Sequence, residues 1–242
     1  MTPVTLVVPC FNEAGRLDVA AWAEGLGRLP GVSPVWVDDG STDATAAVLH
    51  GLVARVGGCL VQLPDNRGKA EAVRVGVQRA IADGAVLVGF FDADLATPLD
   101  ELPRLVAELD ARPEAWMAAG SRRPVEGAVI ERRWLRHHLG RLAAALARWV
   151  LGTPFYDTQC GAKVFRVVPE VEDAFSTPFT VTWTFDVELI ARLLDAPRGT
   201  PSRLIEVPLR RWRDVPVSKV HWTDALRAPL ALLGVWWRRH RK

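Results

Sequence analysis

Two aspartates in the segment FFDADLATP have the residue type and spacing that most directly suggest chemistry. Asp92 and Asp94 follow the apolar run Val86–Phe91, which has the length and composition of a buried strand. Side chains two residues apart in an extended chain point to the same face, so we expect both carboxylates on one side of a loop. Such oxygen donors hold Mg²⁺ or Mn²⁺ together with substrate phosphates. They are therefore predicted metal ligands, the alternatives being a helix-capping pair or the acid/base dyad of a hydrolase.

Polar side chains also gather where the first two apolar runs end, in the segments VVPCFNE and VDDGSTD. They are Asn12, Glu13, Asp38, Asp39, Ser41 and Asp43. A carboxylate directly after a buried strand can accept hydrogen bonds from a base or a ribose. Ser41 or Thr42 is predicted to cap the helix that follows. Capping alone is the alternative role for this segment.

A third loop, DNRGKAEAV, places Gly68 and Lys69 at the start of a predicted helix. Backbone N–H groups at a helix start, joined by a lysine, suit a phosphate. The Walker A pattern GxxxxGK[ST] is absent, which excludes a P-loop. The chain has only four lysines against 26 arginines, so a lysine in a loop motif indicates a site that requires a compact ammonium.

Strand-length apolar runs alternate with helical patterns along the first half of the chain. The predicted strands are Val4–Val8, Pro34–Val37, Cys59–Leu63, Val86–Phe91 and Trp116–Ala119, and the predicted helices are Arg16–Leu29, Thr42–Val56, Lys69–Ala82 and Leu99–Ala111. This order predicts an α/β fold with a largely parallel sheet flanked by helices. Ligands of such sheets bind beyond the carboxyl ends of the strands, so the polar loops should line one site.

The second half of the chain has a less regular pattern. We expect an Arg-rich segment at Glu131–Leu151, an irregular stretch containing TPFYDTQCGAKVFR, a helix at Phe185–Leu194, a strand at Arg203–Val207 and an amphipathic helix at Trp222–His240. No internal repeat or long linker is present. The expected organisation is a single domain, with residues 1–220 carrying the catalytic fold and residues 221–242 forming a basic amphipathic C-terminal helix.

Composition limits the class of protein. The 242 residues are 49% hydrophobic and 24% charged, which indicates a globular chain and excludes low complexity. Three cysteines without a CxxC support neither a disulfide framework nor a thiolate zinc site. Polar residues follow the N-terminus too soon for a signal peptide, and the uncharged run Ala228–Trp237 is too short to span a bilayer. We expect a cytoplasmic protein.

Basic residues accumulate toward the C-terminus. From Arg198 onward the chain has eleven basic and three acidic residues, although its overall net charge is only +2. The stripe Leu226, Leu230, Leu233 and Trp237 recurs at helical spacing within this tail, with Pro229 as an expected kink or restart. This pattern predicts peripheral binding to an anionic membrane surface, the inner face of the cell membrane. Packing of the stripe on the core or in a homodimer is the alternative. Tryptophans among Leu, Ala and Pro argue against nucleic acid.

The motifs VVPCFNE, VDDGSTD, DNRGKAEAV, FFDADLATP and GSRR, in this order, resemble the family-2 glycosyltransferases, which have the GT-A (Rossmann-like) fold. The later segments DTQCGAKVF, WTFDVELI and RRWRDVPVSKV are similar to the polyprenyl-phosphate sugar transferases, especially the dolichyl-phosphate β-glucosyltransferases and then the mannosyltransferases. The resemblance extends from about Val4 to Val220. It implies a hexosyltransferase with a nucleotide-sugar donor, a polyprenyl phosphate acceptor, and Mg²⁺ or Mn²⁺ as cofactor.

The resemblance assigns roles by position. Residues matching the donor-binding positions are Pro9, Asn12, Glu13, Asp39, Lys69, Gln159, Lys163 and Lys219, and those matching the DxD metal loop are Asp92, Ala93 and Asp94. Basic positions that receive the acceptor phosphate in mannosyl relatives match Arg122 and either Arg132 or Arg133. Asp157 shares the sugar-transfer block with Gln159 and Lys163, and Asp186 and Glu188 match an acidic helix start. The predicted catalytic residues are Asp94, Arg122, Arg132, Asp157 and Asp186.

The reaction implied by the resemblance is an inverting transfer, with UDP-glucose as the expected donor. A phosphate acceptor is already anionic and requires positioning by cations rather than a strong base. A sugar hydroxyl acceptor would instead require Asp157 or Asp186 as the base. Two departures concern sugar identity: Ala96 replaces a Gln of the mannosyl relatives, and Ala162 replaces the Phe of QCGF. GDP-mannose is the alternative donor, and a metal-dependent nucleotidyltransferase is the alternative enzyme, although its GxGxRxxP-type loop is absent.

Overall fold

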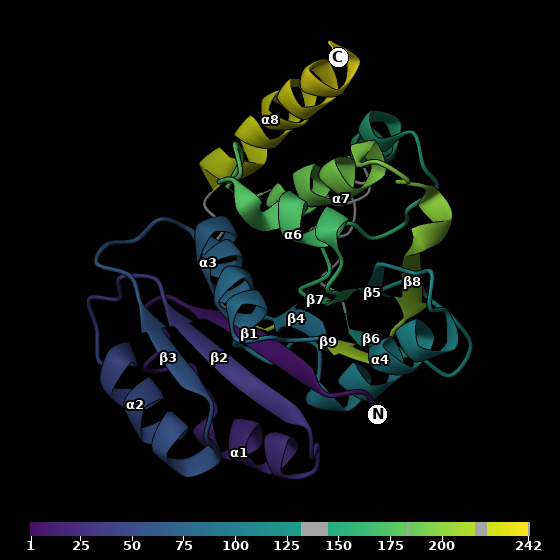
Figure 1. Cartoon of the computed structure of the whole chain (residues 1–242). Coiled ribbons are helices and arrows are strands. Elements are labelled where there is room, and N and C mark those ends of the chain that lie inside the picture. Colours follow the sequence, from purple (N-terminus) through teal and green to yellow (C-terminus); the bar gives the residue numbers. More distant parts are fainter. Residues whose placement is uncertain (132–144, 183, 216–221, 242) are drawn as a thin grey trace.

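A seven-stranded sheet organises the molecule. The computed structural model describes the chain apart from residues 132–144, 183, 216–221 and 242 (Figure 1). The strands are β1 (Val4–Cys10), β2 (Val32–Asp38), β3 (Cys59–Gln62), β4 (Leu87–Phe91), β5 (Met117–Ser121), β7 (Ala162–Arg166) and β8 (Leu204–Pro208). Their order is β3-β2-β1-β4-β7-β5-β8. The largely parallel sheet predicted from the alternation of strands and helices is confirmed.

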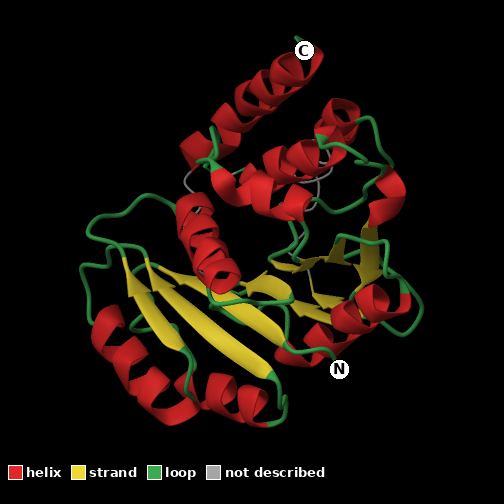
Figure 2. Cartoon of the chain, in the orientation of Figure 1, coloured by secondary structure: helices red, strands yellow, loops and turns green. Residues whose placement is uncertain are grey.

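Helices cover both faces of this sheet (Figure 2). On one face lie α1 (Val19–Gly27), α2 (Thr45–Val56) and α4 (Leu102–Ala111), and on the other lie α3 (Lys69–Ala82), α6 (Pro169–Ser176) and α7 (Phe185–Asp195). Strand β1 shows how the sequence divides between two layers, because Leu6 and Val8 join one core and Val7 joins the other. The parallel strands are thus buried on both sides.

The register brings the ends of the parallel strands together. Cys10 at the end of β1 pairs with Asp38 of β2, which in turn pairs with Gln62 of β3. Strand β4 pairs with β1 as far as Phe90. The loops after β1, β2, β3 and β4 therefore leave the same edge of the sheet, as the sequence predicts.

Strand β7 corrects the expectation of an irregular stretch around QCGAKVFR. It lies between β4 and β5 and is antiparallel to both. Its second residue, Lys163, is charged and fully buried, so the strand departs from the continuous apolar run by which a buried strand is recognised. Helix α6 and the small sheet formed by β6 (Val129–Glu131) and β9 (Arg211–Arg213) were also not predicted. Each of these elements is too short for a helical or strand periodicity to be recognised in the sequence.

Several helices begin later than the sequence suggests. Helix α1 starts at Val19 because Asp18 caps it, accepting a hydrogen bond from the N–H of Ala21 at 2.9 Å. Helix α2 starts at Thr45, and its N-cap makes no side-chain hydrogen bond, so the prediction that Ser41 or Thr42 caps it is wrong. A short 3-10 helix at Leu99–Glu101 precedes α4.

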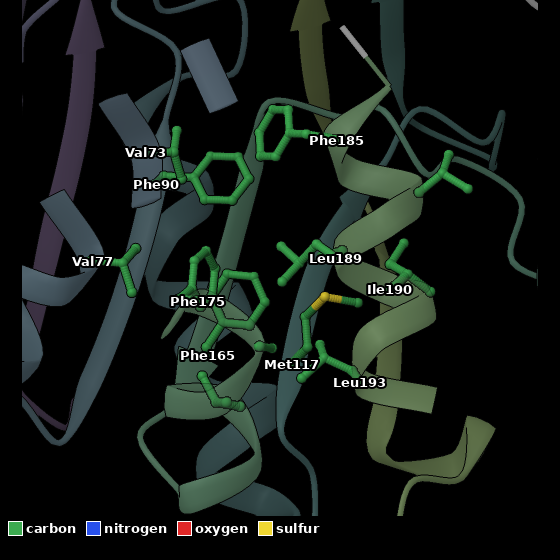
Figure 3. Close-up of a cluster of buried hydrophobic side chains, with 14 of the residues drawn as sticks. Val73, Val77, Phe90, Met117, Phe165, Phe175, Phe185, Leu189, Ile190 and Leu193 are labelled. Atoms are coloured by element: carbon green, nitrogen blue, oxygen red, sulfur yellow. The ribbon is translucent and has the colours of Figure 1, made fainter. Parts of the chain in front are cut away.

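Aromatic side chains form the centre of one core layer. Phe90 of β4 lies 5.9 Å from Phe185 of α7 and 6.1 Å from Phe165 of β7, measured between ring centroids. Figure 3 shows these rings together with Leu189 and Met117. The packing therefore joins the inserted strand β7 and helix α7 to the parallel half of the sheet.

Helix α8 (Trp222–His240) ends the described chain and continues through Pro229 without a break. Leu232 and Val235 are buried and belong to the same core cluster as α7. Figure 1 shows the far end of this helix projecting beyond α6 and α7. In the described part of the chain, no helix combines the length and the apolarity that crossing a bilayer requires.

Candidate functional site

The loop after β4 carries Asp92 and Asp94 at the carboxyl edge of the sheet. Asp92 Oδ1 lies 2.5 Å from Lys69 Nζ at the start of α3, and Asp94 Oδ2 lies 3.6 Å from the guanidinium of Arg16. Asp94 also accepts a hydrogen bond from the N–H of Ala96 at 3.0 Å. Burial raises the pKa of Asp94, and the negative charge of Asp92 raises it further. The two carboxylates are thus close enough to repel each other.

The glycine that ends the QCG segment, Gly161, makes room for Asp92. The N–H of Asp92 donates to the carbonyl of Gly161 at 3.0 Å, so the two backbones are adjacent. A Cβ at position 161 would overlap the carboxylate of Asp92. The antiparallel strand β7, which follows directly, is the element that brings this glycine to the carboxyl edge.

The first two loops hold each other through Asn12. Its N–H donates to Ser41 Oγ at 2.9 Å, and its side-chain oxygen accepts from the N–H of Thr42 at 2.8 Å. Asn12 has a positive φ of 48°, a conformation that asparagine tolerates better than most residues. The N–H of Glu13 donates to Thr45 Oγ1 at 2.7 Å. Ser41 and Thr42 therefore shape the loop rather than cap the helix.

Asp39 organises the loop that precedes α3. Its two oxygens accept from the N–H groups of Arg67 and Gly68 at 2.9 and 2.8 Å. Gly68 has a φ of 88° and lies at the N-cap of α3, a conformation that favours glycine. Burial raises the pKa of Asp39 above its usual value, and the two backbone hydrogen bonds oppose that rise. Asp39 thus connects the β2 loop to the start of α3.

Lys69 lies at the first residue of α3, among carboxylates. Burial lowers the pKa of its ammonium, but Asp92, Asp186 and Asp94 together raise it above the usual value. The side chain stays charged near neutral pH. A cation at the N-terminus of a helix, beside two carboxylates, suits the binding of a metal-bound diphosphate.

Arg122 and Asp157 form a close ion pair behind this loop. The guanidinium Nε and Nη2 donate to the two carboxylate oxygens at 2.6 and 2.7 Å, and the Arg122 N–H also donates to Asp157 at 2.9 Å. Burial raises the pKa of the Asp157 carboxyl, but Arg122 outweighs this effect, so that its pKa lies below the usual value. Trp212 of β9 lies under the guanidinium, with its centroid at 5.2 Å.

A second buried pair joins β7 to α7. Lys163 Nζ lies 2.6 Å from Asp186 Oδ1 and donates to the carbonyl of Cys160 at 2.7 Å. Lys163 is fully buried and lies 5.3 Å from the Phe90 ring centroid. Two residues after Asp186, Glu188 accepts from the N–H groups of Thr180 and Val181. Glu188 therefore holds the loop that precedes α7.

The predicted site residues divide into three groups. Lys69, Asp92, Asp94, Arg122, Asp157, Lys163 and Asp186 are connected by the ion pairs and electrostatic contacts described above. A second group lies at the strand ends and in the loops around these charges: Pro9, Asn12, Glu13, Asp39, Ala93 and Gln159. In this group, the Ala93 carbonyl accepts a hydrogen bond from Trp22 Nε1 at 2.9 Å. Arg132, Arg133 and Lys219 lie outside the described residues.

Two further charged residues at the site are not predicted from the sequence. Arg16 lies between Glu13 and Asp94, 3.5 Å and 3.6 Å away, and the sequence signal for it is a lone arginine in FNEAGR. Glu206 of β8 accepts from the N–H groups of Tyr156 and Asp157 at 2.6 and 2.7 Å. Glu206 lies far from the motifs in sequence and reaches them only through the sheet.

The donor set fits a divalent cation that also binds phosphate. Asp92 and Asp94 supply carboxylate oxygens, and a cation between them would relieve their mutual repulsion. In the described part of the chain, no cluster of three or more His, Cys, Asp or Glu side chains forms a complete metal site. A metal held here would therefore depend on substrate phosphates and water for its remaining ligands, as Mg²⁺ does.

Sequence comparison identifies the family of the chain. Residues 5–168 match the sequence profile described as "Glycosyl transferase family 2". The chain belongs to glycosyl transferase family 2. The chain is a glycosyltransferase, and the matched segment contains every loop at the carboxyl edge described above.

Curated relatives extend the similarity beyond this segment. A dolichyl-phosphate beta-glucosyltransferase of Mus musculus is 30% identical over 236 residues, covering 90% of this chain and 69% of the relative. The Drosophila melanogaster protein of the same name is 29% identical with the same coverage. An undecaprenyl-phosphate 4-deoxy-4-formamido-L-arabinose transferase of Enterobacter is 30% identical over 67% of this chain and 48% of its own.

Comparison with solved structures supports the architecture. Glucosyl-3-phosphoglycerate synthase of Mycobacterium tuberculosis, solved with Mn²⁺, UDP and glucosyl-3-phosphoglycerate, superposes with a TM-score of 0.69. The superposition covers 98% of this chain and 80% of the synthase at 19% identity. At this identity the likeness establishes the GT-A fold.

Proposed function

We propose that the protein transfers glucose from UDP-glucose to a polyprenyl phosphate, with inversion at the anomeric carbon. Similarity to dolichyl-phosphate glucosyltransferases over 90% of the chain supports the reaction class. The relatives' names also include an undecaprenyl-phosphate acceptor, which supports a polyprenyl phosphate as the shared acceptor chemistry. The choice of a phosphate acceptor rests on the ion pairs that Asp157 and Asp186 form within the site.

The donor would lie along the carboxyl edge of β1 to β4. Asn12, Glu13 and Asp39 are proposed to bind the base and ribose, with Pro9 shaping the strand end. Lys69 at the start of α3 is proposed to bind the diphosphate. Asp92 and Asp94 would hold Mg²⁺ or Mn²⁺, which supplies positive charge to the departing UDP. Structures of the synthase with Mn²⁺ and UDP-glucose support this cofactor class.

The acceptor argument rests on the two carboxylates that could serve as a base. Asp157 accepts two hydrogen bonds from the Arg122 side chain, and its pKa is lowered, so it is a weak base. Asp186 is paired with the buried Lys163 at 2.6 Å. A sugar hydroxyl would require one of these carboxylates to take a proton. A phosphate monoester is already anionic and needs only positioning, which Arg122 is proposed to provide.

One of the two sequence departures bears on donor identity. Ala96 replaces the Gln of mannosyl-type relatives, and we propose UDP-glucose in preference to GDP-mannose on this basis, whereas Ala162 replaces the Phe of the usual QCGF and favours neither sugar. Gln159, Lys163 and Lys219 are proposed to contribute to the donor side, with Lys163 acting from its buried position through Asp186. Arg132 is proposed as a second cation for the acceptor phosphate.

The proposed acceptor resides in a membrane, which bears on where the enzyme works. We propose that residues 1–220 carry the reaction and that residues 221–242 attach the enzyme to the cytoplasmic face of that membrane. Three free cysteines are consistent with a reducing compartment. A homodimer through the C-terminal helix is the competing proposal.

One assay tests the function. Radiolabelled UDP-glucose and GDP-mannose are each incubated with Mn²⁺ and one acceptor: a polyprenyl phosphate, the corresponding polyprenol, or 3-phosphoglycerate. Label should enter the lipid phase only with UDP-glucose and the phosphorylated lipid. Transfer to the polyprenol or to 3-phosphoglycerate would contradict the acceptor proposal, and transfer from GDP-mannose would contradict the donor proposal.

A further inference from the structure

Helix α8 has two apolar faces, and only one of them is covered. Leu232 and Val235 are buried against the core. Leu230, Leu233 and Trp237 are 72%, 43% and 49% exposed. Spacings of three and four residues place these three side chains on one helical stripe, away from the buried pair. The sequence alternative in which this stripe packs on the enzyme's own core is therefore wrong for these residues.

A second exposed tryptophan, Trp149, lies beside helix α8. Trp149 is 56% exposed, and its ring stacks on Trp236 with centroids 5.3 Å apart. Arg239 holds the two segments together, donating to the carbonyl of Val150 at 2.9 Å and pairing with Asp195 of α7. We call Trp149, Leu230, Leu233 and Trp237 the α8 patch. It is presented by a fixed helix rather than by a loose tail.

The charges beside the α8 patch are basic. Arg238 and Arg241 are both exposed, and the Arg241 guanidinium lies 3.6 Å from the Trp237 ring centroid. The nearby Asp195 is neutralised by Arg239. Leucine and tryptophan flanked by arginine is the combination that binds at the headgroup boundary of an anionic bilayer.

We propose that the α8 patch binds the surface of an anionic membrane, with Trp237 and Arg241 at the headgroup level. Size argues against a second copy of the chain as the occupant. Two half-exposed tryptophans and two leucines offer on the order of 400 Å², since a whole aromatic side chain buries about 150–250 Å². A stable protein interface buries about 800 Å² on each partner. A lipid surface has no such minimum, because the arginines add electrostatic attraction.

The α8 patch is connected to the candidate site, so membrane binding would bring the site close to a lipid acceptor. This step rests on the proposed function. Arg238 of α8 donates to Thr180 Oγ1 in the loop before α7. Thr182 of the same loop lies beside Gly68, at 3.8 Å from where a Cβ would stand. Figure 1 shows α8 beginning near the start of α3 and running past α6 and α7. Attachment through α8 would therefore hold the start of α3 close to lipid phosphates.

The test compares vesicle binding of the full chain and a patch variant. The variant carries Leu230→Gln, Leu233→Gln and Trp237→Gln, and the matched control carries Val86→Gln and Val125→Gln, which are exposed valines elsewhere. Full burial of one such apolar side chain contributes roughly tenfold or more to partition, so the variant should bind phosphatidylglycerol-containing vesicles at least about 100-fold more weakly. The control should bind like wild type.

A variant that lacks two arginines measures the electrostatic contribution to vesicle binding. Replacing Arg238 and Arg241 by Gln should weaken binding roughly fivefold per residue on phosphatidylglycerol-containing vesicles. Binding to pure phosphatidylcholine vesicles should not change. Equal binding of wild type and the patch variant, or no vesicle binding by wild type, would overturn the proposal. A wild-type dimer in sedimentation equilibrium that the patch variant loses, without vesicle binding, would replace the membrane by a second copy.

An activity readout distinguishes this proposal from the proposed function. Transfer to a short, water-soluble prenyl phosphate should be equal in wild type and patch variant, whereas transfer to a long polyprenyl phosphate in vesicles should fall in the variant. Absence of transfer to both acceptors in wild type would refute the proposed function and leave the vesicle comparison to decide the α8 patch.

Discussion

Single side chains at this site mostly bind other charged side chains of the chain itself. Lys69 contacts Asp92, Arg16 lies near Asp94, and Asp157 pairs with Arg122. Such pairs keep the charges in place at a partly exposed edge, and the cost of an unpaired ion is largest for the buried Asp157. Donor binding would replace part of this pairing, because diphosphate and metal bring the same charges as the partners they displace.

Asp94→Asn should remove the metal-dependent part of donor binding. Loss of an outer-shell partner alone typically costs about 10–100-fold in metal affinity, so loss of a direct ligand should cost at least about 100-fold. Isothermal titration with UDP-glucose, with and without Mn²⁺, measures the effect. Asp100→Asn is the control, since Asp100 pairs with Arg28 and Arg211 at the surface. Unchanged Mn²⁺ dependence in Asp94→Asn would exclude Asp94 as a ligand.

Arg122→Ala should slow transfer and leave UDP-glucose affinity nearly unchanged, because the guanidinium is proposed to meet the acceptor. The variant leaves Asp157 unpaired, so the free energy of unfolding should also fall by about 1.5–3 kcal/mol. Asp157→Asn keeps the cation and should lose less activity, whereas exposed Arg123→Ala should resemble wild type. Steady-state kinetics and denaturant unfolding measure both effects. Equal loss of activity in Arg122→Ala and Asp157→Asn would make the pair purely structural.

Elements show where sequence reasoning succeeds and where it fails. The strands that end in polar loops are predictable because buried parallel strands are continuous apolar runs, as Leu87–Phe91 illustrates. Strand β7 escapes detection because the charged Lys163 interrupts its apolar run, and the carboxylate that pairs with this lysine, Asp186, lies on a helix 23 residues later. Glu206 escapes for the same reason, and so does the contact of Arg16 with Asp94, since these partners are brought together by the sheet order and not by local spacing.

Gly161→Ala tests whether the start of β7 holds the metal loop. The new methyl group would overlap the Asp92 carboxylate, so the loop after β4 must shift. We expect kcat/KM to fall by at least about tenfold, the change that about 1.4 kcal/mol of lost transition-state stabilisation produces. Gly51→Ala in α2 is the control. It meets no atom within 4 Å and should raise the stability by about 0.5–1 kcal/mol. Wild-type activity in Gly161→Ala would show that Asp92 can move without cost.

At the scale of the whole molecule, the part of the chain that matches the family and the C-terminal helices α7 and α8 share one hydrophobic core. Residues 5–168 match the family profile and contain the loops that we propose bind the donor. The remainder supplies α7, whose Asp186 reaches back to Lys163, and α8, whose buried face packs in the same cluster as α7. Because α7 contacts both the site and α8, ligand binding and membrane binding would stabilise one continuous structure.

This unity predicts a single thermal transition that shifts with ligand. A ligand at 100 times its dissociation constant adds about 2.7 kcal/mol to the free energy of unfolding. For a chain of this size, 1 kcal/mol corresponds to about 2–4 °C in Tm, so UDP-glucose with Mn²⁺ should raise Tm by about 5–10 °C. Scanning calorimetry with chelator present should show most of this shift lost, since Asp92 and Asp94 would then repel the diphosphate. GDP-mannose at the same concentration should give little shift. A larger shift with GDP-mannose, or one that survives chelation, would reassign the donor or remove the metal from the site.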